Sequence, residues 1–216
     1  LQAKVKSTFE ENFDDNDASW QTSGSGASKG LGSHNGSGES GGTMVWVSTH
    51  TGGQNPVYTL DLTSLSDITT VASDWTLRFK FIDIVDNSST ANYGSFGVTA
   101  GTSNALTSEH HAVCSIGGNE MTLSARNNTH IEPSTGNSIE NTAGGNEVRY
   151  VEIKSDSGIV TLNVYNNSDY SDTPSTMSTT VSLTGLRYLK LNGKGSNSGY
   201  LHVGIDDVEF YDGVVL

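Results

Sequence analysis

The chain has little cysteine, proline or positive charge, and each shortage excludes a class of protein. One cysteine, Cys114, rules out an internal disulfide. Three prolines and 16% charged residues are fewer than a disordered chain of low hydrophobicity usually carries. No apolar run approaches the ~20 residues of a membrane-spanning helix. Eleven Lys and Arg stand against 24 Asp and Glu, which disfavours nucleic acid and anionic membranes as partners.

What remains is typical of an all-β protein with long polar loops. Glycine contributes 25 residues, and the hydrophobic 33% is gathered in short alternating runs. Segments 23–42, rich in Gly and Ser, and 127–146 are long polar stretches, which in a compact domain are usually functional or mobile. The formal net charge of −13 is compatible with metal cations, neutral sugars or a saline habitat.

Short runs of alternating apolar and polar residues predict strands. Residues 75–81 alternate most clearly, followed by 150–154 and 160–164, which are joined by a hairpin turn at 156–158. Residues 189–191 predict another strand. Weaker strands are predicted over 43–49, 57–62, 95–99, 112–116, 121–125 and 179–183. Segment 61–71 is expected to be a loop or one short turn, and Trp20 and Trp75 are expected in the core.

The last strand changes its hydrophobic phase in the middle. Leu201 to Ile205 alternate in one parity, whereas Val208 and Phe210 have the opposite parity. A strand of period two cannot do this without a bulge or a buried polar residue. The change falls at Asp206 and Asp207, so we expect the irregularity there.

An ordered set of motifs resembles concanavalin A-like (laminin G-like) jelly-roll domains. The motifs are 9–15 (FEENFDD), Trp20, 75–81 (WTLRFKF), 149–154 (RYVEIK), 186–191 (LRYLKL) and 204–213 (GIDDVEFYDG). The resemblance implies a two-sheet antiparallel β-sandwich whose first and last strands are neighbours, often with a structural calcium near the termini. It places one sandwich domain over 9–213, an N-terminal tail or strand over 1–8 and a C-terminal tail over 214–216.

Acidic residues are concentrated at both ends of that domain. If the terminal strands pair, Glu10 lies near Asp206 and Asp207, and convergent carboxylates suit calcium, which takes six to eight oxygen ligands. We therefore predict Glu10, Asp206 and Asp207 as calcium ligands. A solvated acidic rim is the alternative.

Catalytic patterns are weak. Glycosidases of this fold carry Glu-x-Asp-x-x-Glu on one strand, and here Gly204 replaces the first glutamate of Gly204-x-Asp206-x-x-Glu209. The histidines of Glu109-His110-His111 are expected on the surface of a polar loop. Cys114 is expected to be a small buried residue. We therefore predict that the chain is not an enzyme.

Sugar sites on sandwiches use exposed aromatic rings beside polar loops. Candidates are Trp46, His50, Tyr58 and Tyr93, with Tyr170 and Tyr200 as further possibilities near loops. Core packing or scattered exposure is the alternative for each. Four Asn-x-Ser/Thr triplets, at Asn35, Asn87, Asn127 and Asn166, permit glycosylation.

Two functions compete at this point. The first is a non-catalytic carbohydrate-binding or adhesion module of a secreted or cell-surface microbial protein. The second is a structural subunit of a filament, sheath or virion, in which apolar-alternating ends, 1–6 and 213–216, add strands to copies of the same chain. A polysaccharide-degrading enzyme is a third. Because the chain starts at Leu1, we expect a processed product or a piece of a longer protein.

Overall fold

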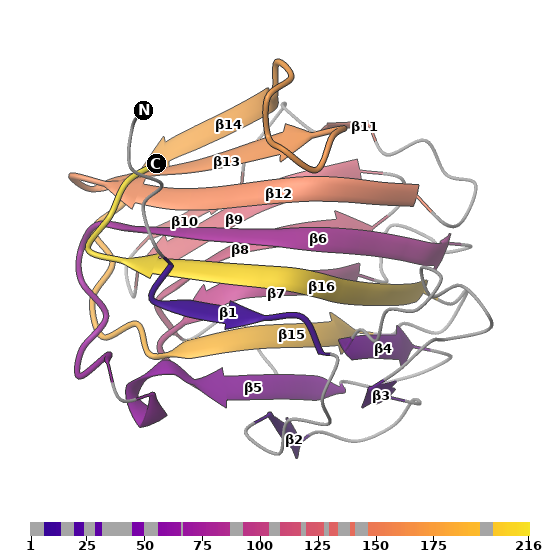
Figure 1. Cartoon of the computed structure of the whole chain (residues 1–216), viewed down its shortest axis with the longest axis horizontal. Helices are drawn as coiled ribbons and strands as arrows, with labels where there is room; N and C mark the ends of the chain where they lie inside the picture. Colours follow the sequence, from indigo (N-terminus) through magenta and orange to yellow (C-terminus); the bar gives the residue numbers. More distant parts are fainter. Residues whose placement is uncertain are drawn as a thin grey trace.

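The fold is a sandwich of two antiparallel sheets, each of eight strands (Figure 1). The computed structural model describes residues 7–13, 20–23, 29–31, 45–49, 56–65, 67–86, 93–103, 109–117, 120–127, 130–133, 139–140, 147–194 and 201–216. This confirms the predicted all-β jelly roll. Among the described residues, no helix has the length and apolar character needed to cross a membrane.

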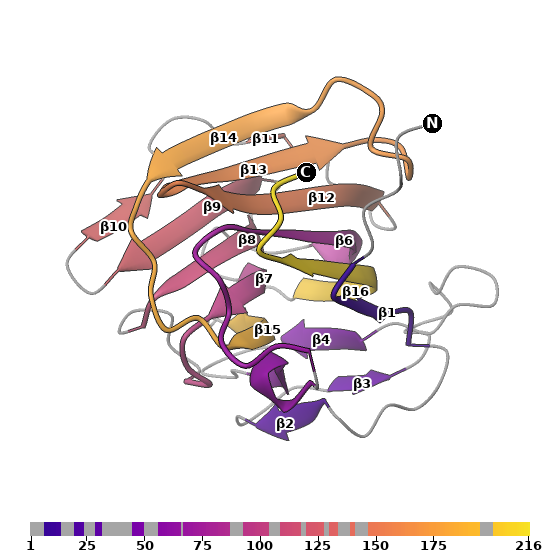
Figure 2. The same cartoon turned by 60° about the vertical axis from the view of Figure 1, so that its left-hand side comes forward.

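Sheet A has the strand order β14-β13-β12-β6-β16-β4-β3, with β1 also paired to β16. Its strands are β1 (Phe9–Glu11), β3 (Lys29–Leu31), β4 (Val45–Thr49), β6 (Trp75–Asp86), β12 (Glu147–Asp156), β13 (Ile159–Tyr165), β14 (Ser175–Thr180) and β16 (Leu201–Asp212). In Figure 2, β12, β6, β16 and β1 of this sheet lie to the right of β9, β8 and β7 of the other layer.

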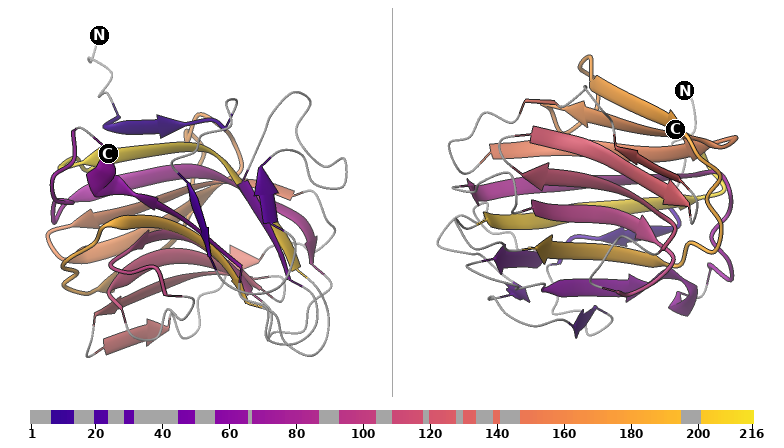
Figure 3. Two further views of the ribbon diagram at one scale, coloured as in Figure 1. Left: turned by 90° about the horizontal axis from the view of Figure 1, so that it is seen from below. Right: turned by 180° about the vertical axis from the view of Figure 1, so that it is seen from behind.

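Sheet B has the order β10-β9-β8-β7-β15-β5-β2, with β11 also paired to β9. Its strands are β2 (Gln21–Ser23), β5 (Val57–Asp61), β7 (Tyr93–Thr99), β8 (His111–Gly117), β9 (Glu120–Asn127), β10 (His130–Pro133), β11 (Ile139–Glu140) and β15 (Tyr188–Lys194). Seen from behind in Figure 3, sheet B lies in front of sheet A.

The core fills the space between the layers because each strand alternates. On β6 the inward residues Trp75, Leu77, Phe79 and Phe81 are all buried, as the alternation predicts. Rings from the two sheets meet edge to face, with the Phe79 and Phe96 centroids 4.8 Å apart. The predicted core residues Trp20, Trp75 and Cys114 are buried.

The two ends of the domain are neighbours, as the resemblance implies. Strand β1 pairs antiparallel with β16, with Phe9 opposite Phe210 and Glu10 opposite Glu209. Beyond β16 the last residues stay on the domain, because the Thr76 hydroxyl donates to the Val214 carbonyl and accepts from the Leu216 amide. Residues 1–6 lie outside the described part of the chain.

The predicted phase change of β16 is a bulge. Asp206 is the register partner of Lys80 and Glu209 that of Arg78, so β16 has one residue more than β6 in this interval. Asp207 has φ of +48°, in the left-handed region that Asp tolerates better than most residues. The extra residue returns Val208 and Phe210 to the core face.

The predicted turn at 156–158 and the short turn within 61–71 are confirmed, whereas the strand predicted over 179–183 begins and ends earlier. The hairpin between β12 and β13 turns at Ser157 and Gly158, both with positive φ. Segment 61–71 contains one 3₁₀ turn, η1 (Leu62–Ser64). The strand predicted over 179–183 instead occupies Ser175–Thr180. The apolar residues after it, including the buried Val181, pack while the chain crosses to sheet B.

Candidate ligand-binding pocket on sheet A

One row of polar side chains crosses six strands of sheet A on the face away from the core. From β1 to β14 the row is Glu10, Glu209, Arg78, Glu152, Asn163 and Thr176, and each residue is the register partner of the next. These positions alternate with core residues on their strands, so their side chains share the outer face. The topology therefore gathers residues that are distant in sequence.

Hydrogen bonds connect four members of this row. Arg78 Nε and Nη2 donate to Glu152 Oε2 over 2.9 and 2.7 Å. The other carboxylate oxygen, Oε1, accepts from Asn163 Nδ2 over 2.9 Å, and Asn163 Oδ1 accepts from the Thr176 hydroxyl over 2.8 Å. Glu152 is buried, and these bonds satisfy both of its oxygens.

A loop over residues 166–172 folds back onto the same face. It brings the Tyr170 ring to 4.5 Å from the Arg78 guanidinium carbon, and to edge-on contacts with Tyr165 and Tyr150. The ring centroids of the two tyrosine pairs are 5.2 and 6.2 Å apart. Tyr170 itself has φ of +55°, so its backbone accepts a strained conformation.

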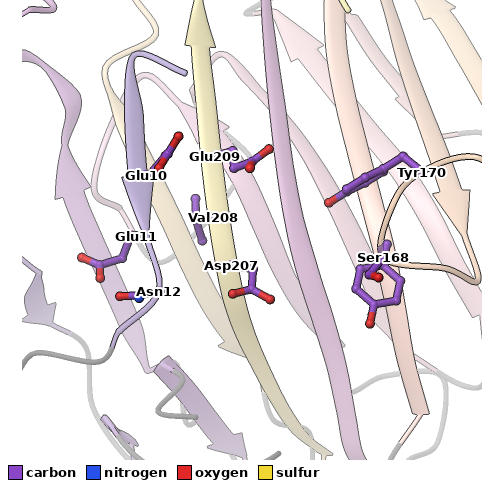
Figure 4. A pocket seen from close by; sticks show the side chains of 9 residues that line it. Glu10, Glu11, Asn12, Ser168, Tyr170, Asp207, Val208 and Glu209 are labelled. Atoms are coloured by element: carbon purple, nitrogen blue, oxygen red, sulfur yellow. The ribbon is translucent and has the colours of Figure 1, made fainter. Parts of the chain in front are cut away.

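A pocket of about 470 Å³ lies between this loop and strands β1 and β16 (Figure 4). Its described lining combines acidic side chains with tyrosine rings: Glu10, Glu11, Asn12, Tyr150, Ser168, Tyr170, Asp207, Val208 and Glu209. In Figure 4 the Tyr170 side chain extends from its loop toward β16. None of the described lining residues is Lys or Arg.

Burial and nearby carboxylates raise the pKa of two tyrosines at the pocket. Burial, followed by the negative charge of Glu209, raises the pKa of Tyr170 above its ordinary value. Burial and a 2.8 Å hydrogen bond to Glu209 raise the pKa of Tyr211 to about 12. At neutral pH both hydroxyls are protonated; that of Tyr211 already donates to Glu209, and that of Tyr170 is a neutral donor beside the acidic residues that line the pocket.

The three predicted calcium ligands do not occupy one place. Glu10 and Asp207 both line the pocket, which agrees with the expected meeting of the chain ends. Asp206 is buried, and its Oδ2 lies 3.8 Å from Lys80 Nζ. An ammonium group beside Asp206 competes with a metal there, whereas Glu10 and Asp207 remain predicted calcium ligands. The described residues contain no group of three or more His, Cys, Asp or Glu arranged around a metal.

The predicted aromatic platform is partly corrected. Tyr58 is only 5% exposed and belongs to the core, because in β5 its parity matches that of inward Leu60. The backbones of Trp46 and Tyr93 lie in β4 and β7, but their side chains are outside the described part. His50 lies outside it entirely. Tyr170 is the aromatic candidate that lines the pocket.

The expectation that His111 is exposed is wrong. It is buried on β8, with Nδ1 3.1 Å from the Glu109 carbonyl and Nε2 3.0 Å from the Ser124 hydroxyl. Glu109 is buried as well, in an ion pair with Lys190, whose side chain is fully enclosed. Segment 100–103 covers this face of sheet B, and two of its carbonyls accept from the Lys190 ammonium. His110 remains partly exposed and accepts from the Thr184 amide.

Two of the four glycosylation asparagines, Asn127 and Asn166, lie in the described part. Asn166 is exposed and donates to Asp172 over 3.4 Å, whereas Asn127 donates to the Ser182 carbonyl over 3.5 Å. Asn35 and Asn87 lie outside the described residues. Glycosylation at these positions remains a prediction.

The sequence patterns did not single out Tyr150, which lines the pocket, or Arg78 and Glu152, which lie behind Tyr170. Alternation at 76–80 and 150–154 places Arg78, Tyr150 and Glu152 on outer faces, but it does not reveal which strands are neighbours. The order of β12, β6 and β16 is what brings these residues beside the chain ends. The sequence points to Glu209 only as the last residue of the incomplete Glu-x-Asp-x-x-Glu pattern.

Comparison with known structures supports the fold. No protein-family model and no curated protein matches this chain. Among solved structures, the carbohydrate recognition domain of Emp47p is 11% identical, with a TM-score of 0.65 over 99% of this chain and 100% of that one. The VIP36 exoplasmic/lumenal domain, in its Ca²⁺- and Man-bound form, is 9% identical, with a TM-score of 0.63 over 92% and 84% of the chains.

A family 7 alginate lyase, A1-II′, is also similar, at 10% identity and a TM-score of 0.55 over 82% of each chain. Lectin domains and an enzyme thus share this architecture. At such low identities the likeness shows the fold alone, which is the concanavalin A-like jelly roll that the sequence motifs predict.

Proposed function

We propose that this chain is a non-catalytic carbohydrate-binding module and that the Tyr170 pocket is its glycan site. The lining of the pocket carries the proposal: tyrosine rings and hydrogen-bonding side chains converge on a cavity of about 470 Å³. The C–H face of a sugar ring packs against aromatic rings, while its hydroxyls need donors and acceptors at the edges. Likeness to a carbohydrate recognition domain and to a Man-bound domain supports the same function.

The charge of the pocket narrows the class of glycan. Its carboxylates come from β1 and β16, and the nearest arginine, Arg78, is bonded to Glu152 instead of lining the cavity. A uronate or sulfate group entering the pocket meets charge of its own sign. Neutral saccharides, or saccharides with free amino groups, are therefore the proposed ligands.

Direct binding measurements test this function. We expect isothermal titration to detect one of the neutral cello-, laminari-, manno- or chitin-oligosaccharides, and oligoalginate to remain unbound. Y170A should weaken that binding by about tenfold or more, which corresponds to ~1.4 kcal/mol of lost stacking. Y188A is the matched control, because Tyr188 is a partly exposed tyrosine on sheet B. Equal binding by Y170A, or silence across the panel, contradicts the proposal.

The module is proposed to be non-catalytic because the recognised strand motif is incomplete at Gly204. Glu10 and Glu209 face each other in the pocket, and a retaining glycosidase needs two carboxylates about 5 Å apart. Here Ser7 and Tyr211 hydroxyls donate to these carboxylates. Release of reducing ends or unsaturated sugars from any oligosaccharide of the panel, lost in E209Q, would show an enzyme instead.

The module is also proposed to bind a calcium ion at the pocket. Glu10 and Asp207 would hold a calcium ion with further oxygens, and the VIP36 structure is a Ca²⁺-bound form of a similar fold. A rise in melting temperature on adding calcium, absent in E10Q, is expected.

A secreted or cell-surface location fits a module that meets glycans outside the cell.

Self-assembly is the second candidate, and strand β14 favours it. Within the described part, β14 pairs only with β13, so its other edge carries free backbone groups. Ser175–Thr180 contains no charge and no proline, the usual devices against strand addition. An extended segment of another copy would fit that edge. Light scattering that shows a monomer at high concentration would exclude this candidate.

A further inference from the structure

We propose that Arg78 is a positioning residue for the glycan site: it fixes the Tyr170 ring that forms one wall of the pocket. The inference rests on the proposed function. Arg78 is not among the described residues that line the pocket, so it acts through Tyr170 and not through the ligand.

The guanidinium of Arg78 is held in a fixed orientation. Two of its nitrogens donate to the same oxygen of Glu152, at 2.9 and 2.7 Å, and its carbon lies 4.5 Å from the Tyr170 ring centroid. Arginine combines in-plane hydrogen bonds with stacking on an aromatic face, which lysine cannot do. One side chain therefore connects β6, β12 and the loop over 166–172.

The partner of Arg78 is itself anchored. Glu152 is 1% exposed, and its second oxygen accepts from Asn163 and lies 3.4 Å from the Lys154 ammonium. Asn163 in turn accepts from Thr176 on the edge strand. Glu152 and Asn163 are the buried centre of this network, and a network in which every member has a partner resists displacement. Arg78 is thus fastened to three strands of the sheet.

Tyr170 depends on such support because its loop has little backbone anchoring. Within 166–172 the described bonds are made mainly by the side chains of Asn166, Asn167, Asp169, Ser171 and Asp172. The Tyr170 amide makes only a long 3.4 Å bond to the Asn167 carbonyl. The Tyr165 and Tyr150 rings meet the Tyr170 ring at 76°, and the Arg78 guanidinium lies over the Tyr170 ring.

A double-mutant cycle on ligand affinity tests the inference. The probe is the neutral oligosaccharide of the panel above that the wild-type chain binds most tightly, and the variants are R78Q, Y170A and R78Q/Y170A. We expect R78Q to weaken binding three- to tenfold in the wild-type background and to have no further effect in Y170A. R78K should restore little, because it keeps the charge and loses the planar contact. Equal losses from R78Q in both backgrounds, or none in either, overturn the inference.

A second measurement needs no ligand. Hydrogen exchange in R78Q should accelerate more in segment 166–172 than in the rest of the chain, where the loss of the cation beside Glu152 lowers protection more evenly. R187Q is the matched control: Arg187 also bonds a carboxylate, Asp61, and stacks on a tyrosine, Tyr188, but on sheet B. If no oligosaccharide binds but R78Q alone accelerates exchange in 166–172, the function fails and the positioning role stands. Unchanged exchange in R78Q overturns the positioning role.

Discussion

The outer faces of the two sheets carry similar residue types in opposite circumstances. On sheet A, Glu10 is exposed and opens onto a pocket with Asp207 and Glu209. On sheet B, Lys190 and Glu109 are buried against each other under the chain that follows β7. Burial raises the pKa of Glu109 and lowers that of Lys190, and the ion pair between them opposes both shifts.

The comparison teaches that burial and pairing decide what a charged residue does. The Lys190 pair is closed to ligands and serves to attach the covering segment to sheet B. Glu10 and Glu209 of sheet A accept hydroxyl hydrogen bonds but line the cavity, so they can also meet a ligand. The K190M and E10Q variants test the closed pair of sheet B and the open carboxylates of sheet A, respectively.

The largest expected effect is on the buried lysine. K190M leaves the Glu109 carboxylate buried without its cation, which should lower the free energy of unfolding by about 3–5 kcal/mol. The matched change, K154M, removes a partly exposed lysine that lies 3.4 Å from Glu152 on sheet A and should cost at most ~1 kcal/mol. Urea unfolding of both variants measures the difference. Equal losses would show that the two faces are not distinct.

The second prediction concerns the loss of stability at acidic pH that is due to His111. Burial lowers the pKa of His111 from its ordinary 6.5 to about 4, with the charges of Lys190, Arg126 and His110 adding to the effect and the Glu109 carbonyl opposing it. Between these values the unfolded chain binds more protons, so stability falls as pH falls from 6.5 to 4, by about 3 kcal/mol. The measurement is the pH dependence of unfolding in wild type minus that in H111Q.

The control for this acid effect is H110Q, because His110 is the partly exposed neighbour. Its pH profile should follow that of the wild-type chain. If H111Q keeps the full wild-type slope between pH 6.5 and 4, His111 is not the buried group that the structure shows.

The third prediction tests the bulge of β16. At φ of +48° a side chain with a β-carbon is strained, so D207A should be less stable than D207G by about 1 kcal/mol. Both variants lack the carboxylate, so their difference isolates the backbone. Thermal unfolding at one salt concentration is sufficient. Equal stabilities would mean that residue 207 does not occupy the left-handed region.

The smallest effect is expected at the facing pair on sheet A. Like charges directly opposite each other on adjacent strands are unfavourable, so E10Q should stabilise the chain by about 0.2–1 kcal/mol at low salt. The gain should vanish at high salt, where surface charges are screened. The measurement is made with a chelator present, because added calcium should reverse the sign if Glu10 is the proposed ligand. A loss of stability in E10Q in the presence of chelator contradicts the prediction.

Much of the fold could be predicted from alternation alone. The β6 pattern places Trp75 and Phe79 inside, and the parity change in β16 locates a bulge that the structure has at Asp207. The site could be predicted only in part. Glu10 and Asp207 followed from the expected pairing of the chain ends, and Tyr170 from its place beside a loop.

The rest of the site depends on strand order, which periodicity does not encode. Arg78 and Glu152 are 74 positions apart, and only the adjacency of β6 and β12 makes them partners. His111 was misjudged for a similar reason: a polar sequence suggested solvent, but the chain before β8 covers that face. Tyr58 was misjudged because its parity within β5 was not decided by a clear alternation.

The most direct test of the account is titration of the neutral oligosaccharide panel into the wild-type chain and Y170A, with Y188A measured in parallel. The account predicts that at least one oligosaccharide binds the wild-type and Y188A chains alike and binds Y170A about tenfold or more weakly. Binding that survives in Y170A, or that Y188A loses to the same degree, would contradict the assignment of the pocket on sheet A as the glycan site.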